Sequence, residues 1–155
     1  MTYYFEDPDR KEALFKELES WIGTPFKHRM GTKKLGCDCF IFWMKVMEAP
    51  EVGVLRPGMT RLPKYDVDWC LHRNEEILLD RVRNHPAVVE INPFEGEPMD
   101  GDIYLYQFGR VCGHSAIYCR GQLYHSITGV GVRATPWVDG LFTPRLKFGF
   151  RVVAK

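Results

Sequence analysis

The segment Gly36-Cys37-Asp38-Cys39-Phe40-Ile41-Phe42-Trp43 decides how the rest of the chain is interpreted. A basic, glycine-containing stretch (residues 24–36) leads directly into Cys39, and an apolar run of helical character follows. This order places a thiol at the first turn of a helix, where free backbone N–H groups and the positive end of the helix dipole favour the thiolate. Because the thiolate is the nucleophilic form, the segment predicts a reactive cysteine at position 39.

Two histidines far downstream are the natural partners of such a cysteine. His114 and His125 each lie inside a short strand-like segment, eleven residues apart. If His114 faces the Cys39 helix, its imidazole can take the thiol proton and later protonate the leaving amine. Neighbouring antiparallel strands can bring His125 within hydrogen-bond distance of His114. His125 would then orient His114, as an Asp or Asn does in other triads.

The order of helical and strand-like segments predicts the fold class. Amphipathic spacing predicts a helix over residues 9–21, capped by Asp7 or Asp9, and the apolar run predicts a buried helix over 39–47. A loop is expected over 49–64 and a third helix over 67–84. Six strands are expected after residue 86, at 88–91, 103–106, 115–118, 123–125, 130–134 and 146–153. Helices followed by a meander of strands indicate one α+β domain over residues 1–155, with N-terminal helices packed on a C-terminal antiparallel sheet.

Composition excludes several classes of protein. With 155 residues and 45% hydrophobic side chains, the chain can bury a real core, and its net charge of +1 gives no drive towards nucleic acid. We interpret the basic group Lys27, His28, Arg29, Lys33 and Lys34 as a solvated loop. No apolar run is long enough to span a membrane, and the first residues lack the features of a signal peptide, so synthesis in the cytoplasm is expected.

A zinc site is the main rival interpretation of the same side chains. Its candidate ligands would be Cys37, Cys39, Cys112, His114, Cys119 and His125. Their spacing does not match the usual C-x₂₋₄-C of structural zinc, so we expect no metal and no cofactor. We interpret Cys37, Cys70, Cys112 and Cys119 as packing residues, and His28, His72 and His85 as surface residues without a convergent partner. An odd number of cysteines also argues against a disulfide framework.

Five blocks of sequence resemble the NlpC/P60 cysteine peptidases and occur in that family's order. They are Trp21-Ile22-Gly23-Thr24-Pro25-Phe26, Gly36-Cys37-Asp38-Cys39, Gly101-Asp102-Ile103-Tyr104-Leu105, His114-Ser115-Ala116-Ile117-Tyr118, and His125. The resemblance implies a papain-like α+β fold, with Cys39 as nucleophile, His114 as base, His125 as the orienting residue and Asp38 as a ligand for a substrate amine. It departs from the family at Phe26, where a Tyr is usual, and at Phe40, where a Ser usually follows the cysteine. Both phenylalanines are therefore candidate substrate contacts that alter the usual preference.

The resemblance also implies a function. The family cleaves peptidoglycan stem peptides, often after D-γ-glutamate, so a γ-D-glutamyl–diamino acid bond is the expected target. Residues 63–69 and 129–132 are similar to a phage and gene-transfer-agent branch, which implies other tail proteins as partners and incorporation into a tail that acts on the cell wall. Two alternatives remain open: a structural tail-tip module with an idle peptidase site, and an amidase or acyltransferase with a non-wall substrate.

Overall fold

The computed structural model describes residues 1–56, 64–65, 69 and 76–154. Its first long helix, α1 (Pro8–Trp21), begins where the sequence predicts. The carboxylate of Asp7 accepts hydrogen bonds from the backbone N–H groups of Asp9 and Arg10, at 2.9 and 3.0 Å. These bonds satisfy donors that lack a partner at a helix start, and Pro8 occupies the first turn, where no donor is needed.

The second helix, α2 (Cys39–Glu48), is the buried helix that the apolar run predicts. Asp38 is its N-cap, and its carboxylate accepts the backbone N–H of Ile41 at 2.7 Å. Trp43, Val46 and Met47 are each at most 1% exposed. The helix therefore passes through the core and presents only its first turn, at Cys39, to a cavity.

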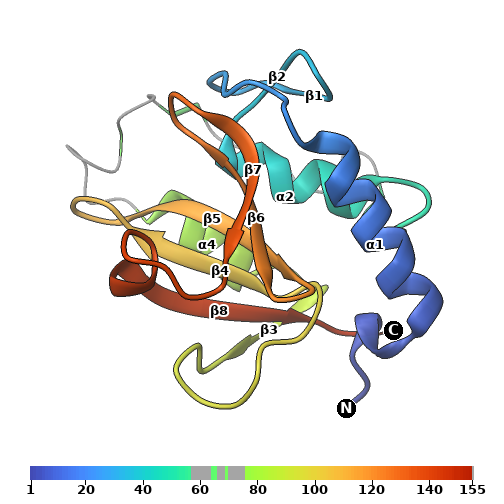
Figure 1. The fold of residues 1–155 in the computed structure, drawn as a ribbon. Helices are drawn as coiled ribbons and strands as arrows, with labels where there is room; N and C mark the ends of the chain where they lie inside the picture. Colours follow the sequence, from blue (N-terminus) through green and yellow to red (C-terminus); the bar gives the residue numbers. More distant parts are fainter. Residues whose placement is uncertain (57–63, 66–68, 70–75, 155) are drawn as a thin grey trace.

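The main sheet has six antiparallel strands in the order β3-β8-β4-β5-β6-β7 (Figure 1). Their bounds are β3 Val88–Ile91, β4 Ile103–Gln107, β5 Cys112–Cys119, β6 Gln122–Ile127, β7 Gly131–Pro136 and β8 Leu146–Val152. All six strands expected from the sequence are present. Two short strands, β1 (Gly31–Thr32) and β2 (Gly36–Cys37), form an additional hairpin just before α2 that the sequence analysis did not predict.

The third expected helix lies only partly within the described chain. Helix α4 (Ile77–Arg83) covers its C-terminal part, whereas residues 66–68 and 70–75 lie outside the described residues. Residues 57–63 of the expected loop, together with Cys70 and His72, also lie outside them. Two short 3₁₀ turns, η1 (Tyr4–Glu6) and η2 (Thr143–Arg145), complete the elements.

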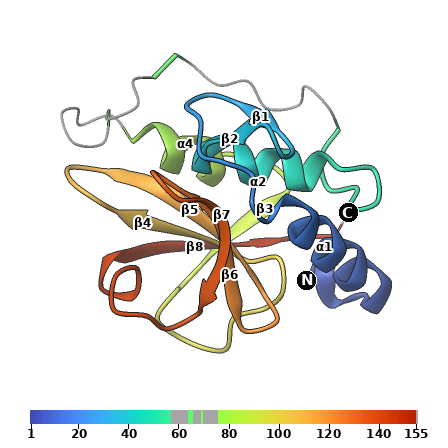
Figure 2. The ribbon, with the colours of Figure 1, turned by 45° about the horizontal axis from the view of Figure 1, so that its top comes forward.

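The helices lie on one face of the sheet (Figure 2). Each face of the sheet carries its own apolar cluster. The helix-side cluster contains Leu14, Trp43, Ile103, Ile117 and Phe150 among its members. The opposite face carries a smaller cluster of Tyr104, Tyr106, Ala116, Leu123, Phe142 and Leu146. Alternation along β5 therefore sends neighbouring residues to two different environments. This confirms the predicted α+β architecture of N-terminal helices packed on an antiparallel sheet.

None of the helices in the described part of the chain is both long and apolar enough to cross a lipid bilayer.

Candidate active site

Cys39 lies at the first turn of α2, against the start of β5. Its thiol donates a hydrogen bond to the backbone carbonyl of Gly113, with Sγ and O 3.4 Å apart. The hydroxyl of Ser115 donates to the backbone carbonyl of Cys39 at 2.7 Å. These two bonds fix the first residue of α2 against the strand, so that the sulfur lies next to the backbone of the residue that precedes His114.

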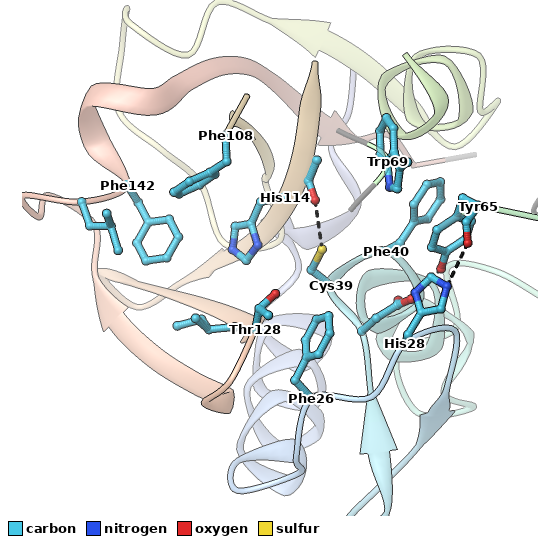
Figure 3. A pocket seen from close by; sticks show the side chains of 14 residues that line it. Phe26, His28, Cys39, Phe40, Tyr65, Trp69, Phe108, His114, Thr128 and Phe142 are labelled. Atoms are coloured by element: carbon cyan, nitrogen blue, oxygen red, sulfur yellow. Dashed lines mark hydrogen bonds between the residues drawn. The ribbon is translucent and has the colours of Figure 1, made fainter. Parts of the chain in front are cut away.

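His114 reaches the cavity from the other face of β5. Ser115, rather than His114, points towards α2, and the His114 ring packs against the opposite cluster. It stacks on Phe142 with ring centroids 5.1 Å apart and meets the edge of Phe108. Cys39 and His114 nevertheless line the same cavity, where Figure 3 shows the sulfur and the imidazole beside each other.

A row of hydrogen bonds continues behind His114. Its Nε2 lies 2.7 Å from Nδ1 of His125, which is the contact that the sequence predicted between adjacent strands. Nε2 of His125 in turn lies 2.9 Å from the hydroxyl of Thr135 on β7. Since the Nε2 atom of His114 is engaged by His125, its Nδ1 atom is the one left to exchange a proton with the thiol.

Burial keeps both imidazoles neutral. It lowers the pKa of His114 well below the usual 6.5, and the adjacent His125 lowers it further. Burial also lowers the pKa of His125 to about 4, although the carboxylate of Asp139 partly opposes this shift. The neutral imidazole is therefore the favoured form of both His114 and His125 in the folded protein.

The cavity in front of Cys39 has a volume of about 500 Å³ and mostly aromatic walls (Figure 3). It is lined by Phe26, His28, Asp38, Cys39, Phe40, Tyr65, Trp69, Phe108, Gly113, His114, Ile127, Thr128, Leu141 and Phe142. All six candidate residues except His125 thus line one cavity, and His125 supports it from behind. No three metal-binding side chains converge anywhere in the described chain.

Asp38 has a structural role that the sequence analysis did not assign. Its carboxylate is 2% exposed and accepts three internal hydrogen bonds. The donors are the backbone N–H groups of Ile41 at 2.7 Å and Arg29 at 2.8 Å, and the hydroxyl of Tyr65 at 2.5 Å. The Tyr65 ring also stacks on Phe40, with centroids 5.1 Å apart. Binding of a substrate amine by this carboxylate stays a prediction.

The three histidines interpreted as surface residues have different outcomes. His28 is exposed, but it lines the cavity and its Nε2 lies 2.8 Å from the backbone carbonyl of Tyr65. The interpretation is wrong for His85, which is 8% exposed and packs edge-on to Trp43. Its Nδ1 accepts the backbone N–H of Ala87, so the turn after α4 folds the ring inward. His72 lies outside the described residues.

The other described cysteines behave as packing residues. Cys37, Cys112 and Cys119 are fully buried, and none lines the cavity. Burial raises the pKa of Cys112 and Cys119 to about 12 and raises that of Cys37 further. Their thiols are therefore protonated and inert at neutral pH.

Four residues of the site were missed by sequence reasoning. Thr135 and Phe142 lie outside every motif block, while Ser115 and Tyr65 lie within quoted blocks but received no role. Ser115 had a weak signal, because alternation on a strand places it opposite His114. Thr135 could be found only from the register of β6 and β7, in which Leu123 faces Thr135 and His125 is the diagonal neighbour of Thr135.

Comparison with known proteins identifies the fold. No protein-family model matches the sequence, and no curated protein matches it. Among solved structures, a lipoprotein-like NLP/P60 protein from Staphylococcus aureus Mu50 has a TM-score of 0.62 at 18% identity, over 96% of this chain. This chain spans only 43% of the length of that protein.

Two other similar structures differ in their reported activity. The NlpC/P60 domain of the peptidoglycan hydrolase SagA has a TM-score of 0.53 at 19% identity, over 90% of this chain and 96% of that domain. RipD from Mycobacterium tuberculosis, described as a non-catalytic NlpC/P60 protein adapted to peptidoglycan binding, has a TM-score of 0.51 at 17% identity, over 90% and 97%. The chain therefore has the NlpC/P60 fold that peptidoglycan hydrolases such as SagA share.

Proposed function

We propose that this protein is a cysteine peptidase that hydrolyses amide bonds in peptidoglycan stem peptides. The observation that carries the proposal is the 2.7 Å contact between His114 and His125 beside a cavity that also contains Cys39 at a helix start. A nucleophile, a base and an orienting residue in one place are what amide hydrolysis by a thiol requires. The fold shared with SagA supports the choice of substrate.

The reaction follows from the orientation of these groups. The Cys39 sulfur attacks the amide carbonyl while Nδ1 of His114 takes the thiol proton, so that the charged pair forms only as the bond to carbon forms. The backbone N–H of Cys39, at the first turn of α2, is placed to stabilise the oxyanion. His114 then gives its proton to the leaving amine, and a thioester remains on Cys39. Water, activated by His114, releases the acyl group and restores the thiol.

The target bond and the setting are the finer parts of this proposal. The bond is of the γ-D-glutamyl–diamino acid type, and the protein works as a tail component that meets the wall from outside the cell. Both rest on the resemblance of the motif blocks and of residues 63–69 and 129–132 to phage and gene-transfer-agent peptidases. Other tail proteins are the partners expected in that setting.

Digestion of purified peptidoglycan tests the proposal. The wild-type protein is expected to release fragments with new amino termini, detected by mass spectrometry, whereas Cys39→Ala and His114→Ala release none. Cys119→Ala is the matched control, because this thiol is fully buried away from the cavity and should leave cleavage intact once folding is verified. Cleavage that persists in Cys39→Ala would contradict the proposal. Binding of peptidoglycan without release would instead match the behaviour described for RipD.

The aromatic lining of the cavity favours a second candidate, an amidase or acyltransferase whose substrate has an apolar acyl group. Phe26 and Phe40 replace polar residues that the family uses, and they face the cavity together with Tyr65 and Trp69. Such walls favour apolar groups through burial of their surface. A competition experiment between a stem tripeptide and an amide with an aromatic acyl group decides between the two candidates. If the protein is a peptidase, it should cleave the tripeptide with the higher kcat/KM.

A further inference from the structure

The hydrogen-bond row behind Cys39 does not end at the two histidines. His125 is fully buried, and its Nε2 lies 2.9 Å from the Oγ1 atom of Thr135. A threonine hydroxyl can donate or accept. The direction of this last bond therefore decides which nitrogen of each imidazole carries its proton.

The charged state of His114 fixes that direction. When His114 holds the thiol proton, both of its ring nitrogens carry hydrogen, so its Nε2–H donates to Nδ1 of His125. Neutral His125 then carries its own hydrogen on Nε2. That hydrogen points at Thr135, whose hydroxyl oxygen has to accept it.

We propose that Thr135 is a positioning residue for the reaction, because its hydroxyl oxygen is the acceptor that holds His125 in the tautomer His114 requires. This inference rests on the proposed function of His114 as the base. Without the acceptor, His125 carries its hydrogen on Nδ1, donates to Nε2 of His114, and leaves His114 with a hydrogen on Nδ1. In that state His114 has no free nitrogen for the thiol proton.

Thr135→Val tests the inference, since valine keeps the branched shape and lacks the hydroxyl. In Thr135→Val the buried Nε2–H of His125 has no acceptor. This loss is unfavourable enough to lower kcat by about tenfold or more. KM should stay unchanged, because Thr135 does not line the cavity. Thr135→Ser should restore kcat. Thr32→Val, at an exposed threonine of the β1–β2 hairpin, is the matched control for the same exchange elsewhere.

A second readout needs no substrate. Two-bond ¹H–¹⁵N correlation spectra report the tautomer of each histidine, and signals are assigned with His114→Gln and His125→Gln. The wild type should show both rings protonated at Nε2, and Thr135→Val should move His114 towards the Nδ1 form. Unchanged tautomers with kcat within about twofold of the wild type would overturn the inference. So would a loss of kcat that Thr135→Ser does not restore. If the wild type cleaves no substrate, the proposed function fails, and the spectra still decide the role of Thr135.

Discussion

Burial of His125 should make the protein sensitive to mild acid. The ring is fully buried, and its pKa is lowered from 6.5 to about 4 in the folded protein. Between pH 6.5 and about 4, the His125 ring is therefore mostly protonated in the unfolded chain but mostly neutral in the folded protein. The stabilising contribution of neutral His125 is complete above pH 6.5, is lost progressively as the pH falls, and is gone below pH 4.

The size of the effect follows from the shift. A displacement from 6.5 to about 4 corresponds to about 3 kcal/mol over the whole range, at 1.36 kcal/mol for each pKa unit. At pH 5 the unfolded histidine is almost fully protonated and the folded one almost fully neutral, so about 2 kcal/mol is already lost relative to pH 8. His114 shifts in the same direction and adds to the loss.

Urea denaturation at pH 8, 6.5 and 5, followed by tryptophan fluorescence, measures this loss. We compare the wild type with His125→Gln, which removes the titrating ring, and with His28→Gln, which removes an exposed histidine. Carboxylates titrate alike in all three proteins, so the difference in slope reports His125 together with its effect on the pKa of His114. The wild type and His28→Gln should lose about 2 kcal/mol more than His125→Gln between pH 8 and 5. Equal losses in all three proteins would refute the reasoning from burial.

Three further predictions concern the first turn of α2 and its supports. Iodoacetamide should modify Cys39 before any other described cysteine, because only this described thiol lines the cavity; peptide mass spectrometry checks the order, and simultaneous labelling would contradict it. Tyr65→Phe should destabilise the protein by about 1–2 kcal/mol in thermal denaturation, since a donor to the buried carboxylate of Asp38 is lost, and an unchanged Tm would count against this bond. Ser115→Ala should lower the stability of the protein by about 1 kcal/mol and should also lower kcat, because its bond to the carbonyl of Cys39 is lost. Ser126→Ala removes an equivalent bond to the carbonyl of Cys37 and should lower stability alone. Equal kcat values in the two variants would argue against the positioning role of Ser115.

The fold could be predicted well because its signals are local. Asp7 and Pro8 mark the start of α1, and strands such as β3 (Val88–Ile91) are bounded by turn residues. The β1–β2 hairpin was missed because its strands have only two residues each, too few for an alternating pattern. The error at His85 has a similar origin, since its burial depends on packing against Trp43, which is 42 positions earlier in the chain.

Sequence could predict only those residues of the candidate site whose side-chain type is itself distinctive. Cys39, His114 and His125 could be named as candidates because few side chains can serve as nucleophile and base, and their roles stay predictions. Their supports could not be named, because Thr135 acts through its place in β7 and Phe142 through its place before η2, and both are common side chains. The low pKa values of the two imidazoles also depend on burial, which no short motif encodes.

The three bonds of the Asp38 carboxylate have an evolutionary consequence. One side chain caps α2 at Ile41, anchors the preceding loop at Arg29 and holds Tyr65 in the cavity wall. A mutation of Tyr65 that adapts the wall to a new substrate therefore also disturbs the turn that presents Cys39. Selection on the cavity wall then also acts on the position of Cys39, so we expect changes at these positions to accumulate as compensated sets.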